Sequence, residues 1–178
     1  MDFVLKREIE NSNRLYVEVI NAKTPSELRK KTENFKGLVV VNGGNDEINR
    51  AAVENKKTEI LLSPELGRER DFIHFRNSGL NQVLCKLAKK NEIAIGFSFN
   101  YLLNSKSKEL VLGKMRQNVV LCRKYKIKTV LGSFASREIE IRNKSELMSF
   151  GKVIGMNGKE IKEALNFRKK EEKIMILK

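Results

Sequence analysis

The sequence predicts an α/β fold on a parallel sheet, either doubly wound or closed into a barrel. Two observations predict it: short, continuously apolar segments alternate with amphipathic ones, and small or polar residues directly follow the apolar segments. Continuous apolar runs are typical of strands covered on both faces, as parallel strands are. Because a full eight-stranded barrel takes roughly 250 residues, a chain of 178 residues favours a shortened or incomplete barrel.

The strand candidates recur along the chain with helical patterns between them. They are residues 15–20, 38–41, 60–62, 93–99 and 129–131. Small or polar residues end them: Asn42-Gly43-Gly44, Ser63-Pro64, Ser98 with Asn100, and Ser133. Ligands usually dock at the carboxyl ends of parallel strands. The alternative is that these residues only form the turns that end the strands, as they do in sheets without a ligand. This edge of the sheet is therefore a candidate ligand-binding site.

The helices between these strands are predicted from caps and apolar stripes. Thr24 and Glu27 form a capping box with Pro25 at the first helical position. Further apolar stripes at helical spacing fall within residues 46–54, 80–88 and 111–122.

The last third of the chain is predicted to be helical. Asn143 caps a helix that Gly155 ends, and Asn157 caps the next one. The chain is expected to form one domain over residues 1–178, with this helical part at about 143–167. Residues 138–141 and 174–177 are additional strand candidates.

Charge points to a polyanionic partner. The chain holds 36 Lys and Arg against 22 Asp and Glu, a net charge of +14. Residues 86–128 carry eleven of the basic residues and only Glu92 and Glu109 against them. Nucleic acid is the first expectation and an anionic membrane the second. The alternative is that the basic stretch forms a solvent-exposed helix face rich in lysine that binds no partner.

Several classes of protein are disfavoured. No apolar run approaches the ~18 residues of a membrane span, and residues 1–10 lack the apolar core of a secretory signal. Cys85 and Cys122 are expected to be buried, reduced thiols, which favours a cytoplasmic location. His74 is the single histidine, and no dinucleotide, phosphate-loop or serine-elbow motif occurs, so neither catalytic residues nor a metal site are expected.

A short motif at 153–162 resembles the G-x-x-G loop of KH RNA-binding domains, which clamps a nucleic-acid backbone between two helices. The order helix 108–126, two strands, helix, G-x-x-G and helix imitates one KH arrangement. The alternative is an ordinary turn in which Gly155 ends one helix and Asn157 caps the next. Met156 and Asn157 stand where KH loops commonly carry a basic residue, which favours the turn.

A longer resemblance spans roughly residues 38–166. Asn-Arg-Ala-Ala-Val-Glu at 49–54 and Pro-Glu-Leu-Gly-Arg at 64–68 are its most specific segments. The remaining segments lie at 39–44, 78–84, 93–97, 102–104 and 133–136. In this order they resemble the ribonuclease P protein component 3 family of archaea and eukaryotes.

This resemblance implies a TIM-barrel-like fold related to polymerase-and-histidinol-phosphatase hydrolases. It implies a non-catalytic subunit of the ribonucleoprotein that removes the 5′ leader from precursor tRNA, in which the RNA acts with Mg²⁺ and the protein binds no cofactor. The implied partners are ribonuclease P RNA, precursor tRNA, protein component 2 and other subunits, without a membrane. Family members usually carry another strand–helix portion before Leu15, and the insertion at 69–76 looks longer than usual.

The predicted RNA-binding residues are basic. Family position singles out Arg50 and Arg68. Local charge adds Arg76, Lys86, Lys90, Lys114, Arg116 and Arg123. These side chains would neutralise phosphates, or else form surface salt bridges, as Arg50 could with Glu47 or Glu54.

A third hypothesis is that the protein is a small barrel enzyme that acts on an anionic substrate. Arg68 and the serines at the strand ends, Ser63, Ser98 and Ser133, would then bind the anion.

Overall fold

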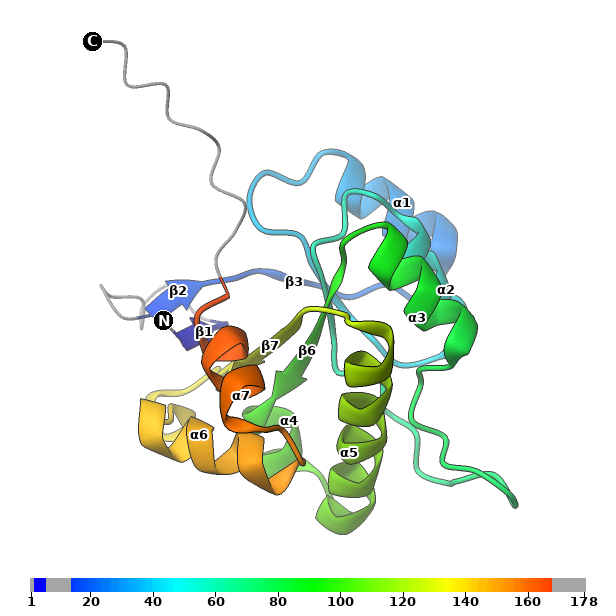
Figure 1. The fold of residues 1–178 in the computed structure, drawn as a ribbon. Coiled ribbons are helices and arrows are strands. Elements are labelled where there is room, and N and C mark those ends of the chain that lie inside the picture. Colours follow the sequence, from blue (N-terminus) through cyan, green and yellow to red (C-terminus); the bar gives the residue numbers. More distant parts are fainter. Residues whose placement is uncertain (1, 6–13, 168–178) are drawn as a thin grey trace, which may run out of the picture.

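The computed structural model describes residues 2–5 and 14–167 of the chain (Figure 1). Its strands are β1 (Asp2–Val4), β2 (Arg14–Tyr16), β3 (Val19–Ile20), β4 (Val40–Asn42), β5 (Ile60–Leu62), β6 (Ala94–Ser98) and β7 (Thr129–Gly132). Its helices are α1 (Pro25–Glu33), α2 (Asp46–Glu54), α3 (Gln82–Lys90), α4 (Phe99–Asn104), α5 (Lys108–Tyr125), α6 (Lys144–Val153) and α7 (Gly158–Leu165), with a short 3-10 helix, η2, at Glu138–Glu140.

The strands pair in parallel and join into a ring. β3, β4, β5, β6 and β7 are neighbours in that order, and β1 pairs with β2, which runs on along the chain into β3. Val4 bridges Ala135 just after β7, where the Leu5 amide donates to the Ala135 carbonyl at 2.8 Å. The prediction of an α/β fold on a parallel sheet is confirmed, and of the two forms left open the strands take the barrel-like one.

Both faces of the strands are covered, which explains the continuous apolar runs. Val40, Ile60 and Ala94 stand side by side in register and belong to the apolar cluster inside the ring. Their neighbours along the chain, such as Val41 and Leu61, belong to the larger cluster that packs beneath the helices. The interior is narrow: a Cβ at position 96 would lie 2.9 Å from the Leu62 side chain, so glycine is needed there.

The predicted caps are present. The Thr24 hydroxyl accepts from the Glu27 amide, and Asn143 and Asn157 each form a capping box with the glutamate three residues on. Cys85 and Cys122 are buried free thiols, and burial raises the pKa of Cys85 to about 11. The helices surround the strand ring, with α7 and α6 on one side and α1, α2 and α3 on another (Figure 1).

Two predicted strands differ in the structure. Residues 138–141 hold η2 instead, because the Glu140 carboxylate accepts from the Ser136 and Arg137 amides and so closes a tight turn. The segment 15–20 is divided at Val17 and Glu18, because its first part pairs with β1 and its second with β4. The strand predicted at 174–177 lies outside the described residues.

The KH arrangement is therefore wrong for this chain. It needs a strand at 138–141, and η2 occupies that place. Gly155, with φ of +87°, follows α6, and Asn157 caps α7, as the alternative of an ordinary turn predicts. Within the described ranges, no helix is both long and apolar enough to cross a membrane.

Candidate RNA interface

The predicted basic residues do not share one face. Arg68 and Arg76 lie in the loop between β5 and α3, which follows a strand and so lies at the carboxyl ends of the strands. Arg123 lies in the last turn of α5, just before β7 begins, at the amino ends. The structure thus brings only some of the predicted residues together, at two opposite ends of the ring.

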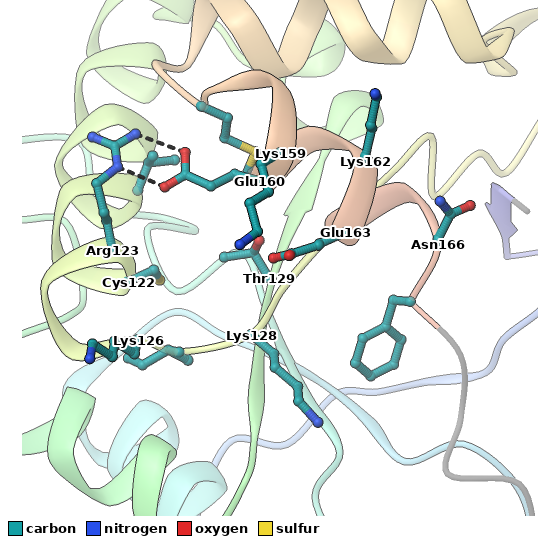
Figure 2. Close-up of a pocket in the computed structure, with 14 residues that line it drawn as sticks. Cys122, Arg123, Lys126, Lys128, Thr129, Lys159, Glu160, Lys162, Glu163 and Asn166 are labelled. Carbon is teal, nitrogen blue, oxygen red and sulfur yellow. Dashed lines mark hydrogen bonds and ion pairs between the residues drawn. The ribbon is translucent and has the colours of Figure 1, made fainter.

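At the amino ends, a groove of about 780 Å³ lies between α5, the start of β7 and α7 (Figure 2). Its apolar lining includes Val119, Cys122, Ile127 and Met156. Its polar lining includes Arg123, Lys126, Lys128, Lys159, Lys162, Glu160 and Glu163. We call this the α5–α7 groove. Five cations against two carboxylates make it basic.

Local backbone structure places these lysines. Lys126 ends α5 in the left-handed conformation, with φ of 53°, and turns the chain into β7. Lys128 is exposed beside that strand, and Lys159 and Lys162 are exposed on α7. None of these four exposed lysines forms an ion pair with another residue that the structure describes, so their charges face solvent in the groove.

The Arg123 guanidinium is engaged in hydrogen bonds within the chain. Its Nε donates to a Glu160 carboxylate oxygen at 2.7 Å, and its Nη2 donates to the Gly155 carbonyl at 2.7 Å. The hydrogen bond from Arg123 lowers the pKa of Glu160. Arg123 therefore holds the turn between α6 and α7 against α5 and supplies less free charge to the groove than the four lysines do.

The remaining outward-facing candidates are scattered. Arg50 on α2 donates to Glu54 at 2.8 Å, the local pair that the sequence allowed for. Arg116 is exposed, and its Nε donates to the Val153 carbonyl at 2.9 Å. Lys86 and Lys90 are exposed on α3. An RNA-binding role for each of them stays a prediction.

Arg68 is also largely committed inside the chain. Its side chain is only 8% exposed and pairs with Asp46 at 2.6 Å. It also donates to Asn77 and to the Pro64 carbonyl.

Lys114 requires a correction. It was predicted to contact RNA, but its residue is fully buried, since α5 packs beneath the β5–α3 loop. Its ammonium donates to the Arg68 carbonyl and lies 3.5 Å from Asp71. In this position Lys114 offers no surface to a phosphate.

A buried polar cluster lies under the same loop. Asn49 donates to the Pro64 and Gly79 carbonyls at 2.9 and 3.0 Å. Asn118 donates to a Glu65 carboxylate oxygen at 3.0 Å and to the Ser78 carbonyl. Burial raises the pKa of Glu65 to about 7. These side chains fix the loop and are closed to a ligand.

The anion site of an enzyme is not assembled at the strand ends. Ser63, Ser98 and Ser133 are all buried. Ser98 caps α4, and the Ser133 hydroxyl accepts from the Arg142 amide at 2.9 Å. Among the residues that the structure describes, no three His, Cys, Asp or Glu side chains are placed to share a metal ion.

Sequence reasoning passed over the four groove lysines as site residues. Lys126 and Lys128 stood within the basic stretch 86–128, and Lys159 and Lys162 flank the G-x-x-G turn. The spacing of the lysines on the outer face of α7 and around the end of α5 was the sequence signal that could have identified them as site residues. The contact between the end of α5 and α7 joins residues distant in sequence, as the ion pair of Arg123 with Glu160 shows.

Comparison with known proteins gives one consistent answer. A family model described as RNase P subunit p30 matches residues 2–174. Ribonuclease P protein component 3 of Methanosarcina acetivorans is 35% identical over 138 residues, which cover 76% of this chain and 54% of that protein. Its counterpart in Thermococcus gammatolerans is 36% identical over 169 residues, covering 92% and 75%.

The fold has a solved counterpart as well. A chain in the cryo-EM structure of archaeal ribonuclease P with mature tRNA superposes with a TM-score of 0.74 at 28% identity. The match covers 89% of this chain and 67% of that chain. The first of these relatives is about twice as long as the part matched here, so the chain spans only part of the relatives' length.

Proposed function

Because the chain belongs to the RNase P subunit p30 family, we propose that it is an RNA-binding protein subunit of ribonuclease P. In this role it stabilises the catalytic RNA that removes the 5′ leader from precursor tRNA. The family match carries the proposal, and the solved archaeal ribonuclease P with mature tRNA supports it. The partners are then ribonuclease P RNA, protein component 2 and other subunits, and precursor tRNA through the holoenzyme.

The mechanism is electrostatic. Exposed cations displace counterions from RNA phosphates, which favours the compact, active fold of the RNA. The α5–α7 groove supplies four exposed lysines that form no ion pair with any residue that the structure describes, and α3 adds Lys86 and Lys90. Arg123 lines the groove but is paired with Glu160, and Arg50, Arg76 and Arg116 are exposed elsewhere on the surface. The protein contributes no catalytic group in this proposal, and Mg²⁺ serves the RNA.

The proposal extends to the organisation and place of the protein. Residues 1–178 act as one barrel-like domain, whose helical part carries the α7 side of the groove. The expected compartment is the cytoplasm.

Reconstitution tests the proposed function. The purified chain is mixed with precursor tRNA and Mg²⁺ alone, and then with cognate ribonuclease P RNA and component 2. We expect no cleavage by the protein alone and faster cleavage when it joins the RNA and component 2. Robust cleavage by RNA-free protein, or no effect on the reconstituted enzyme, would overturn the proposal.

A further inference from the structure

The loop between β5 and α3 exposes large apolar side chains at its tip. Phe72 is 50% exposed, Ile73 95% and Phe75 65%. The two phenylalanine rings lie with centroids 4.6 Å apart and planes 37° apart. We call residues 69–76 the aromatic loop; in Figure 1 it is the blue-green segment that projects away from the body below α3. Exposed rings are costly in water, and such a patch marks a binding surface.

Arg70 precedes the two rings along the chain, His74 lies between them and Arg76 follows them, while Glu69 is an exposed carboxylate at the start of the same loop. Arg70, His74 and Arg76 are exposed in the same short segment. Asp71 is turned toward the base of the loop, where its carboxylate accepts from the Asn77 amide at 3.0 Å and faces Lys114. Aromatic rings beside guanidinium and imidazole groups form the surface on which unpaired nucleobases stack and phosphates pair.

The aromatic loop is held in shape before any partner arrives. The Phe72 amide donates to the Phe75 carbonyl at 3.0 Å and so closes the tip. Lys114 and Arg68 anchor its base from within the protein. A Cβ at position 113 would overlap the Arg76 guanidinium, so that group lies directly on α5 at a glycine. A fixed loop loses little conformational entropy when it binds.

We propose that the aromatic loop binds unpaired RNA nucleotides by stacking their bases on Phe72 and Phe75. The inference rests on the proposed function and adds to it a second RNA contact, at the carboxyl ends of the strands, opposite the α5–α7 groove. A protein partner is the competing occupant. RNA is favoured because the chain as a whole carries a net charge of +14 and Arg70 is exposed two residues before Phe72, where it can pair with a phosphate of a stacked nucleotide.

A tryptophan reporter tests stacking directly, since the chain has no tryptophan. Phe75→Trp is titrated with single-stranded oligouridylate and with a fully paired RNA duplex of the same length. We expect the fluorescence to be quenched by the single strand and much less by the duplex. The matched control is Val120→Trp, at an exposed α5 position of similar exposure. Equal responses of the two tryptophans to the single strand would overturn the proposal.

Graded substitutions separate RNA from a protein partner. Phe72→Ala with Phe75→Ala should weaken binding of single-stranded RNA roughly 5- to 150-fold, the range measured for one stacked base. Replacement of both by Tyr should preserve affinity, because the π faces remain, and replacement by Leu should not. Unchanged circular dichroism confirms that each variant is folded.

The same series shows what would contradict the proposal. If the Leu pair binds RNA as the wild type does, or if the Ala pair weakens only assembly with component 2, the loop is a protein-docking site. Failure of the proposed function has a different signature, in which the wild-type chain itself gives no stimulation in reconstitution.

Discussion

Lys114 shows how a single buried ammonium organises a functional surface without touching a ligand. It lies beneath the aromatic loop, where it meets the Arg68 carbonyl and Asp71. Hydrogen-bond acceptors around a buried ammonium offset the cost of its burial, and removing the ammonium leaves those acceptors without their donor. The residue is thus a structural anchor of the loop.

Replacing Lys114 by methionine should therefore cost stability. Methionine replaces the apolar stem of the lysine while the ammonium is lost, and we expect a loss of about 1–3 kcal/mol in the free energy of unfolding. Lys86→Met, on the exposed face of α3, is the control and should change it by less than ~0.5 kcal/mol. Urea denaturation of both variants measures the difference. Equal stabilities would contradict the anchoring role.

Glu65 gives the protein a pH dependence with a defined sign. Burial raises its pKa from the ordinary value of 4.5 to about 7. Between these two values the folded state holds a proton that the unfolded state has lost, so the contribution of Glu65 to stability falls as pH rises from about 4.5 to 7. Below that window it is fully present, and above it the loss is complete.

Glu65→Gln should remove this dependence. The amide stays neutral, and its NH₂ can donate to the Asn118 carbonyl oxygen, which has no partner among the described residues. As the pH rises from 5 to 8, we expect the free energy of unfolding of the variant to increase relative to that of the wild type by an amount on the order of 3 kcal/mol. Urea denaturation at the two pH values measures this gain, with Glu69→Gln on the exposed loop as control. A parallel pH dependence of wild type and variant would show that Glu65 is ionised throughout.

At the scale of elements, the turn between α6 and α7 is explained by backbone geometry alone. Gly155 has φ of +87°, a conformation that favours glycine, whereas Gly158 has no such φ and starts α7 with open space around its Cβ position. Arg123 from α5 holds this turn in place through the Gly155 carbonyl. The two glycines therefore have different reasons to be where they are.

The two glycines should respond differently to alanine. Gly155→Ala is expected to lose about 1 kcal/mol or more of stability, because alanine is strained at positive φ. Gly158→Ala should be neutral or stabilising by up to about 1 kcal/mol, because alanine favours the helix. Thermal unfolding and RNA affinity are measured on both. A large loss of RNA affinity in folded Gly158→Ala would revive a backbone-clamping role for the turn.

At the scale of the whole molecule, the two proposed RNA contacts lie at opposite ends of the strand ring. The α5–α7 groove lies at the amino ends of the strands and the aromatic loop at the carboxyl ends. The strand ring separates them, with its narrow apolar interior between. One end offers exposed lysines and the other offers aromatic rings, so salt should weaken binding at the groove more than at the loop.

Salt dependence should therefore locate the groove contact. Each phosphate neutralised steepens the log–log dependence of affinity on salt by roughly 0.7 to 0.9. Replacing Lys126, Lys128, Lys159 and Lys162 together by glutamine should flatten the slope by about 1 to 3 units. Folding should be preserved, because all four side chains are exposed.

The matched control removes the same charge elsewhere. Four other exposed lysines are replaced by glutamine: Lys23, Lys30, Lys36 and Lys56. This control should leave the slope nearly unchanged. If both sets flatten it equally, net charge alone governs binding and the groove has no special part.

The sequence by itself determined the parallel strands, the helix caps and the family, because each depends on residues close together in the chain. Apolar runs revealed strands covered on both faces, and the capping box at Asn157 fixed the start of α7. The pairing of Arg50 with Glu54 could be foreseen for the same reason, since the two are one helical turn apart.

Only the tertiary structure decided which charges and rings are free. Lys114 is buried and Arg123 is paired because of partners distant in sequence, Asp71 and Glu160. Phe72 and Phe75 are exposed because the loop that carries them projects from the body, which the sequence does not show. Burial depends on which distant segments pack against each other in the fold, and the local periodicity of the sequence does not predict those contacts.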